Sequence, residues 1–188
     1  MTGRYAGPVK RALALAAVLL LTGCAAASAN VTTAHGLKKV HDPRHVTGTI
    51  TGQCHYRDKG QLPDPRCTPG SIDPAVTQAN LSSTICRSGY TKTVRPPESQ
   101  TEHAKWDVVE PAYRVSDLKG ELDHLVPLEL GGSNDLSNLW VEAGRIPNPK
   151  DRTELALRDA VCGGRVTLAA AQNAIASDWL TAEKKLGL

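Results

Sequence analysis

The chain has 188 residues and carries 22 basic and 19 acidic side chains, giving a formal net charge of +3. This length is enough for one domain of ordinary size. Three basic residues and no acidic ones lie in the first 23 positions, so the remaining 19 basic residues equal the 19 acidic ones. This balance excludes the strong basic field of proteins that bind nucleic acid tightly. Any contact with a polyanion must come from a local patch.

The first 23 residues have the pattern of an export signal. A basic start precedes an apolar stretch at 12–21, which is too short to span a membrane. Leu21-Thr22-Gly23-Cys24 resembles the lipobox of bacterial lipoproteins, in which the cysteine is lipidated and becomes the new N-terminus. The resemblance implies that a lipid on Cys24 anchors the protein at the outer face of the cell membrane. Plain secretion, with cleavage after 27–29, is the alternative.

Residues 24–46 are polar and rich in small side chains, so they can bury little surface. This composition predicts a flexible tether that leads to a single domain at 47–188. His41 and His45 have the spacing of two metal ligands on one helical face, but Pro43 between them disfavours a helix. We therefore interpret this segment as a solvated linker.

Residues 47–71 are interrupted by Gly and Pro in their second half, which predicts an irregular segment. The spacing of Val76, Leu81 and Ile85 predicts a short helix at 76–85. An extended turn at 94–97 and a helix at 102–113 follow. We expect Trp106 and Tyr113 to be core anchors, because the chain has no Phe and must build its core from few aromatics. Platforms on which a ligand stacks are the alternative.

Four cysteines remain after Cys24, an even number in a chain expected in an oxidising compartment. Two disulfides are the natural use, although four cysteines allow three pairings. We favour Cys54 with Cys67, which closes a short Pro-rich loop, and Cys86 with Cys162, which ties the middle of the chain to its end. A structural zinc site is the alternative, but no Cys-x-x-Cys pair occurs.

The last third of the chain has the clearest pattern. Two short strands are expected around 122–128 and 138–142, with Gly131-Gly132 turning the chain between them. Helix formers with early acidic residues predict a helix at 151–162, stopped by two glycines. Thr167 can cap a second helix, whose apolar residues recur at three- and four-residue steps up to Leu186 and include Trp179.

Residues 121–140 resemble the heart of the HNH nuclease family. Asp123-His124 matches the first element of its motif and Asn138 the second, within a frame formed by Pro127, Gly131, Gly132, Leu139 and Trp140. The resemblance implies an α+β domain with a strand-strand-helix (ββα-metal) core at 121–162. C-terminal helices follow this core, and an irregular, disulfide-stabilised half precedes it.

The motif carries the chemistry of phosphodiester hydrolysis. His124 suits a general base, because a histidine of ordinary pKa is mostly neutral at pH 7. Asp123 suits a hard divalent cation, Mg²⁺ first and Mn²⁺ second. Because neighbouring side chains on a strand point to opposite faces, we expect the two residues to straddle the scissile phosphate. The resemblance implies that Asn138 pins the loop that orients His124.

The third element of the motif is usually a histidine, and no histidine follows His124. Some HNH enzymes use asparagine there, which makes Asn148 the candidate metal ligand, with a turn residue as the alternative reading. Asp151 is a further candidate, as a ligand or a helix cap. Lys150 and Arg145 are candidate phosphate contacts, with solvated surface charge as the alternative.

Two functions are compatible with these residues. The first is an exported, metal-dependent HNH endonuclease that acts on nucleic acid, with DNA favoured over RNA. The second is a non-catalytic, exported lipoprotein binding module on a degenerate HNH fold, which the missing histidine and the neutral charge favour. No pattern in the sequence indicates a protein partner.

Overall fold

The computed structural model describes residues 1–3, 36–115 and 119–188. The chain divides into two units, Met1–Ala34 and His35–Leu188, and the fold given below is that of the second. Positions 4–23 of the predicted export signal, Cys24 and the first part of the predicted tether lie outside the described residues. No helix in the described ranges is long and apolar enough to cross a membrane.

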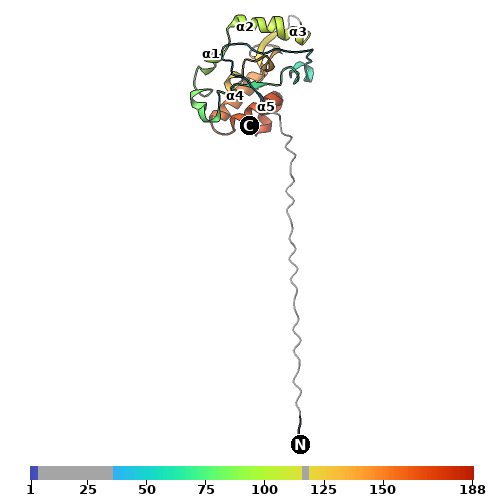
Figure 1. The fold of residues 1–188 in the computed structure, drawn as a ribbon, viewed down its shortest axis with the longest axis vertical. Helices are drawn as coiled ribbons and strands as arrows, with labels where there is room; N and C mark the ends of the chain where they lie inside the picture. Colours follow the sequence, from blue (N-terminus) through green and yellow to red (C-terminus); the bar gives the residue numbers. More distant parts are fainter. Residues whose placement is uncertain (4–35, 116–118) are drawn as a thin grey trace. The chain divides into compact units, whose positions relative to one another are not determined.

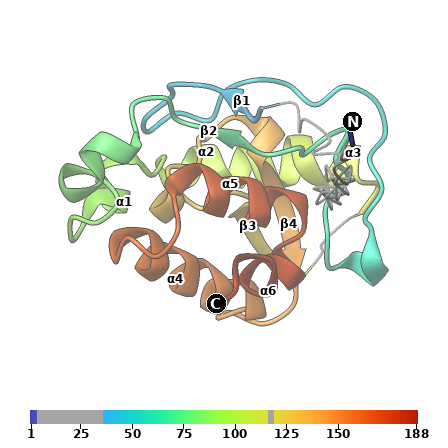
Figure 2. The same ribbon diagram turned by 90° about the horizontal axis from the view of Figure 1, so that it is seen from below.

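The second unit is an α+β fold with two small sheets (Figures 1 and 2). β1 (Lys38–Lys39) pairs in parallel with β2 (Ser71–Ile72), and β3 (Gly120–His124) pairs antiparallel with β4 (Leu139–Ala143). The α-helices are α1 (Tyr90–Val94), α2 (Glu98–His103), α3 (Glu110–Ala112), α4 (Pro149–Cys162), α5 (Leu168–Ser177) and α6 (Ala182–Leu186). η3 (Ala104–Val109) is a π-helix, and the 3₁₀ helices are η1 (Asp58–Gly60), η2 (Gln78–Ser83), η4 (Leu128–Leu130), η5 (Leu136–Asn138) and η6 (Trp179–Thr181).

The β3–β4 hairpin lies between two groups of helices. In Figure 1 the segment from α2 to α3 lies at the top of the folded unit, and α4 and α5 lie at the bottom. One apolar cluster packs α4 and α5 on the loop after β3, through Val126, Leu130, Leu157 and Ile175. A second cluster packs η3 and α3 on the hairpin, through Val109, Tyr113, Leu139 and Val141. The hairpin is therefore held from both sides.

The two strands and two helices predicted for the last third of the chain are present, but their first and last residues differ from the prediction. β3 begins two residues earlier than predicted, and β4 has the predicted length but begins one residue later. β3 ends at His124 because the side chain of Asn138 then takes over both the N–H and the carbonyl of Val126. The predicted cap at Thr167 accepts from the N–H of Ala170, as expected. The helix it starts is interrupted at Asp178, whose carboxylate caps η6.

Elements in the middle of the chain differ more. The helix predicted at 76–85 is the 3₁₀ helix η2, and the one predicted at 102–113 begins earlier and continues through α2, η3 and α3. Tyr113 and Trp179 are buried, as predicted. Trp106 is not a core residue, because 45% of it is exposed.

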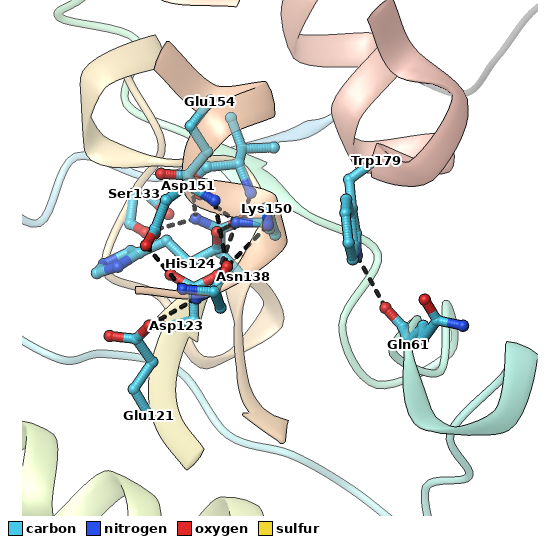
Figure 3. A network of polar contacts seen from close by, with 12 residues as sticks. Gln61, Glu121, Asp123, His124, Ser133, Asn138, Lys150, Asp151, Glu154 and Trp179 are labelled. Atoms are coloured by element: carbon cyan, nitrogen blue, oxygen red, sulfur yellow. Dashed lines mark hydrogen bonds and ion pairs between the residues drawn. The ribbon is translucent and has the colours of Figure 1, made fainter. Parts of the chain in front are cut away.

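Both predicted disulfides are present, Cys54–Cys67 and Cys86–Cys162. The second joins the segment after η2 to the end of α4, across 76 residues of chain. Trp179 adds another long-range tie, because its Nε1 donates to the carbonyl of Gln61 at 2.8 Å (Figure 3).

Residues 36–46 pack against the domain and do not form the tether predicted for them. Lys38 Nζ lies 3.0 Å from both carboxylate oxygens of Asp135. Asp42 is only 5% exposed and accepts from the N–H of Asn134 at 2.9 Å. Leu37 and Val46 also pack on the apolar clusters. Composition misses this docking because the segment has few apolar side chains and is held largely by polar groups.

Candidate active site

His124 ends β3 and is almost fully buried. Its Nε2 lies 3.0 Å from Oδ1 of Asn134. The amide nitrogen of Asn134 donates to the backbone carbonyls of Asp42 and Val94, so Oδ1 is the atom left to accept from histidine. Nε2 of His124 therefore carries the ring proton, and Nδ1 keeps the lone pair that a general base needs.

His124 borders two cavities. The smaller, of about 150 Å³, is also lined by Asp123, Glu154 and Arg95. The larger, of about 450 Å³, extends from Arg95 and His124 to Trp106. Asp123 and His124 thus meet the same small cavity, although their side chains have different partners.

The pKa of His124 lies well below its usual value. Burial lowers the pKa to about 4, even though the carboxylate of Asp123 favours the protonated ring. The imidazole is therefore neutral at pH 7. Arg95 is exposed nearby, and its charge also lowers the pKa of His124.

α4 brings Lys150 against the end of β3 (Figure 3). Its side chain is completely buried, and Nζ lies 2.7 Å from Oδ2 of Asp123 and 2.7 Å from the carbonyl oxygen of His124. The third donor goes to Glu154. Burial alone would lower the pKa of Lys150, but Asp123 and Glu154, which accept its hydrogen bonds, outweigh burial and raise it. Lys150 is a buried ammonium with every donor used, so in this arrangement it offers none to a phosphate.

One buried ammonium faces more than one carboxyl group. Burial would raise the pKa of Asp123, but Lys150 outweighs burial and keeps that pKa below its usual value. Burial and the charge of Asp123 raise the pKa of Glu142 to about 8, and the two carboxyl groups share a hydrogen bond. Burial also raises the pKa of Glu154 to about 8. At pH 7 Asp123 therefore holds the negative charge that balances Lys150.

Asn138 is completely buried and acts as a brace. Its Nδ2 donates to the carbonyls of Val126 and Ser133, and its Oδ1 accepts from the N–H groups of Val126 and Ser71. These bonds hold the loop between His124 and β4. Gly132 lies within this loop, where a Cβ would collide with the carbonyl of Val126. Only glycine lets the backbone approach so closely.

Asn148 caps α4. Its Oδ1 accepts from the N–H groups of Lys150 and Asp151, and its Nδ2 donates to Glu121 at 2.6 Å. Asp151 closes a capping box by accepting from the N–H of Asn148. Both residues thus serve the start of the helix, and the structure gives Asn148 no metal-ligand geometry. Arg145 is exposed in the turn before the helix.

The donors at this site have the chemistry for Mg²⁺ or Mn²⁺, which prefer oxygen ligands. Their arrangement does not fit a cation, however, because Asp123, Glu154 and the His124 carbonyl all converge on the ammonium of Lys150. Within residues 36–115 and 119–188, no three His, Cys, Asp or Glu side chains are grouped to hold a metal. As placed, the residues form a lysine site and not a metal cage.

The sequence analysis did not predict four residues of the site, Arg95, Asn134, Glu142 and Glu154, and the two carboxyl groups carry no local signal. Asn134 lies within the quoted motif, but an asparagine next to two glycines and a serine reads as a turn residue. Arg95 comes from a distant turn, and its neighbouring prolines gave no functional signal. No family model, curated protein or solved structure matches the chain, so the site stands on its own geometry.

Proposed function

We propose that this protein is an extracytoplasmic HNH-type endonuclease that hydrolyses phosphodiester bonds in nucleic acid, with DNA as the favoured substrate. The observation that carries the proposal is the orientation of His124. Asn134 holds the proton on Nε2, which leaves the Nδ1 lone pair on a ring that borders a cavity shared with Asp123 and Arg95. A histidine that only filled space in the core would need neither a fixed ring proton nor access to a cavity with charged residues.

In the proposed reaction, Nδ1 of His124 takes a proton from the water that attacks the phosphorus atom. As the new P–O bond forms, the P–O bond to the departing sugar oxygen breaks, and that oxygen takes a proton from solvent water. The guanidinium of Arg95 offsets the charge that builds on the phosphate oxygens. A pKa of about 4 makes free His124 a weak base. The negative charge of a bound phosphate would raise that pKa and strengthen the base. Asn138 and Asn134 keep the loop and the ring in place throughout.

A requirement for Mg²⁺ or Mn²⁺ is part of the proposal and rests on the motif, with Asp123 as the expected ligand. Because Lys150 engages Asp123, we derive no step through a metal ion. Chelation gives a direct test: plasmid cleavage that persists in EDTA would remove the metal from the proposal and leave the role of His124 standing.

The deciding experiment is plasmid cleavage by the protein in Mg²⁺ or Mn²⁺, compared with a His124→Ala variant. His55→Ala is the matched control, because His55 is an exposed histidine far along the chain from the motif. We expect wild type and His55→Ala to nick the plasmid and His124→Ala to be at least 100-fold slower. Equal cleavage by all three proteins, or none by any of them on plasmid and on single-stranded DNA, would refute a nuclease based on His124.

A non-catalytic binding module is the second candidate, and the Lys150–Asp123 pair favours it. A carboxylate neutralised by a buried lysine has little need of a metal ion. Calorimetric titration with Mg²⁺ and Mn²⁺ separates the two candidates when combined with the cleavage assay. No metal binding and no cleavage by a folded protein would establish the module.

Export also belongs to the proposal. The two disulfides are compatible with an oxidising, extracytoplasmic compartment. We propose that Cys24 carries a lipid that anchors the protein to the membrane. Mass spectrometry of the mature N-terminus should find a lipidated Cys24, and an unmodified N-terminus after residue 29 would favour secretion.

A further inference from the structure

The groove that leads away from His124 contains an exposed aromatic ring. Trp106 is 45% exposed and lines the larger cavity, together with Arg95 and Lys105. The other two tryptophans of the chain, Trp140 and Trp179, are 0% and 5% exposed. Trp106 is thus the one indole available to a ligand.

The backbone presents this ring to the groove. Trp106 lies in the π-helix η3, whose two buried residues are Ala104 and Val109. In a π-helix these positions, five apart, lie on one face, so Trp106 between them turns away from the core. The wide turn of η3 therefore anchors the helix on the hairpin and leaves the ring outside.

The charges of the groove are mixed. Lys105 Nζ lies 4.2 Å from the centre of the Trp106 ring and donates to the carbonyl of Gly120. The ammonium of Lys105 covers one face of the ring, so a ligand would stack on the opposite face. Three carboxyl groups, of Glu98, Glu102 and Glu121, also line the groove. With two basic residues against three acidic ones, phosphate attraction alone would not hold a polyanion here.

We propose that this groove binds an unpaired nucleotide next to the scissile phosphate, with its base stacked on Trp106. This inference rests on the proposed function of His124. Stacking on an aromatic ring requires a base whose faces are free, which single strands provide and a duplex does not. The cavity of about 450 Å³ lies in the size range of small-ligand pockets. The substrate class is therefore single-stranded or locally unwound nucleic acid.

Tryptophan fluorescence tests the proposal in EDTA, so that cleavage does not interfere. The probe is a short thymidine oligonucleotide, with a duplex of the same length as the comparison. Because the other two tryptophans are buried, quenching on binding reports on Trp106. We expect the single strand to quench the emission and the duplex to quench it far less.

Binding of a fluorescein-labelled copy of the same oligonucleotide, followed by anisotropy, gives the affinities of variants. Trp106→Ala should bind roughly tenfold more weakly, which is about 1.4 kcal/mol, whereas Trp106→Phe keeps a ring and most of the affinity. Leu180→Ala is the control, because Leu180 is an exposed apolar residue on η6 that does not line the groove. Thermal melting confirms that each variant is folded.

The stacking site at Trp106 and the proposed nuclease activity can be refuted independently of each other. Unchanged affinity in Trp106→Ala, no single-strand binding by wild type, or equal affinity for duplex would overturn the stacking site. Cleavage that depends on His124 would still support the nuclease in that case. Conversely, a tenfold effect at Trp106 together with cleavage that is indifferent to His124→Ala would keep the site and refute the nuclease.

Discussion

The ammonium of Lys150 lies 2.7 Å from Oδ2 of Asp123, and its side chain is completely inaccessible to solvent. This pair links the end of β3 to the first turn of α4. In this structure the carboxylate of Asp123 is committed to a lysine of the same chain. This ion pair and the neighbouring carboxyl groups of Glu142 and Glu154 should determine how the stability of the protein depends on pH.

Lys150→Met should lower the free energy of unfolding by about 3–5 kcal/mol, because it leaves the Asp123 carboxylate buried without its partner. Urea unfolding followed by circular dichroism measures the change. Lys184→Met, at an exposed lysine on α6, is the matched control and should cost less than about 0.5 kcal/mol. Similar losses in the two variants would contradict a buried, paired ammonium.

Glu142→Gln should change how stability depends on pH. The pKa of Glu142 is raised from 4.5 to about 8, so between these values the folded protein keeps a proton that the unfolded chain releases. Wild-type stability therefore falls as pH rises through this window, by up to roughly 1.4 kcal/mol per pH unit for each such group. Unfolding measured at several pH values should show a smaller fall in Glu142→Gln.

Glu154 has the same raised pKa, so part of the fall remains in the single variant. His124 acts in the opposite direction. Its pKa is lowered to about 4, so stability is lost as pH falls from about 6.5 to about 4. A Glu142→Gln variant with an unchanged slope between pH 5 and 8 would show that Glu142 is ionised in the folded protein.

Asn134→Ala should release the ring of His124. Nitrogen NMR of the histidine side chain should find the proton on Nε2 in wild type and a mixture of tautomers in the variant. Cleavage should fall roughly 10- to 100-fold, as for other orienting partners. Asn173→Ala, at an exposed asparagine on α5, should alter neither result. A wild-type proton on Nδ1 would rule out the assigned geometry.

Removing the Cys86–Cys162 disulfide by a double substitution to alanine should cost about 4 kcal/mol of stability, because that bond closes 76 residues. Removing Cys54–Cys67, which closes 13 residues, should cost about 3 kcal/mol. Denaturant unfolding of the two double variants checks the order. The reverse order would mean that local packing, and not chain closure, sets the contribution of each disulfide.

Much of the last third could be predicted because its signals are local. Thr167 caps its helix through a bond that spans three residues, and Gly163 ends α4 within one turn. The 3₁₀ helix η2 and the π-helix η3 were not predictable in kind. Apolar spacing of three to five residues does not separate these helices from an α-helix.

The sequence by itself determined that two disulfides were to be expected and where helices start and end, at Thr167 and Gly163, because an even cysteine count and bonds within one helical turn can be read from the residues alone. It favoured one cysteine pairing out of three, and the structure contains that pairing. Only the tertiary structure decided that Lys150 pairs with Asp123, that Asn134 orients His124, and that Trp106 faces a groove. These relationships join groups from different elements. Their strength comes from burial, and burial exists only once the chain has packed.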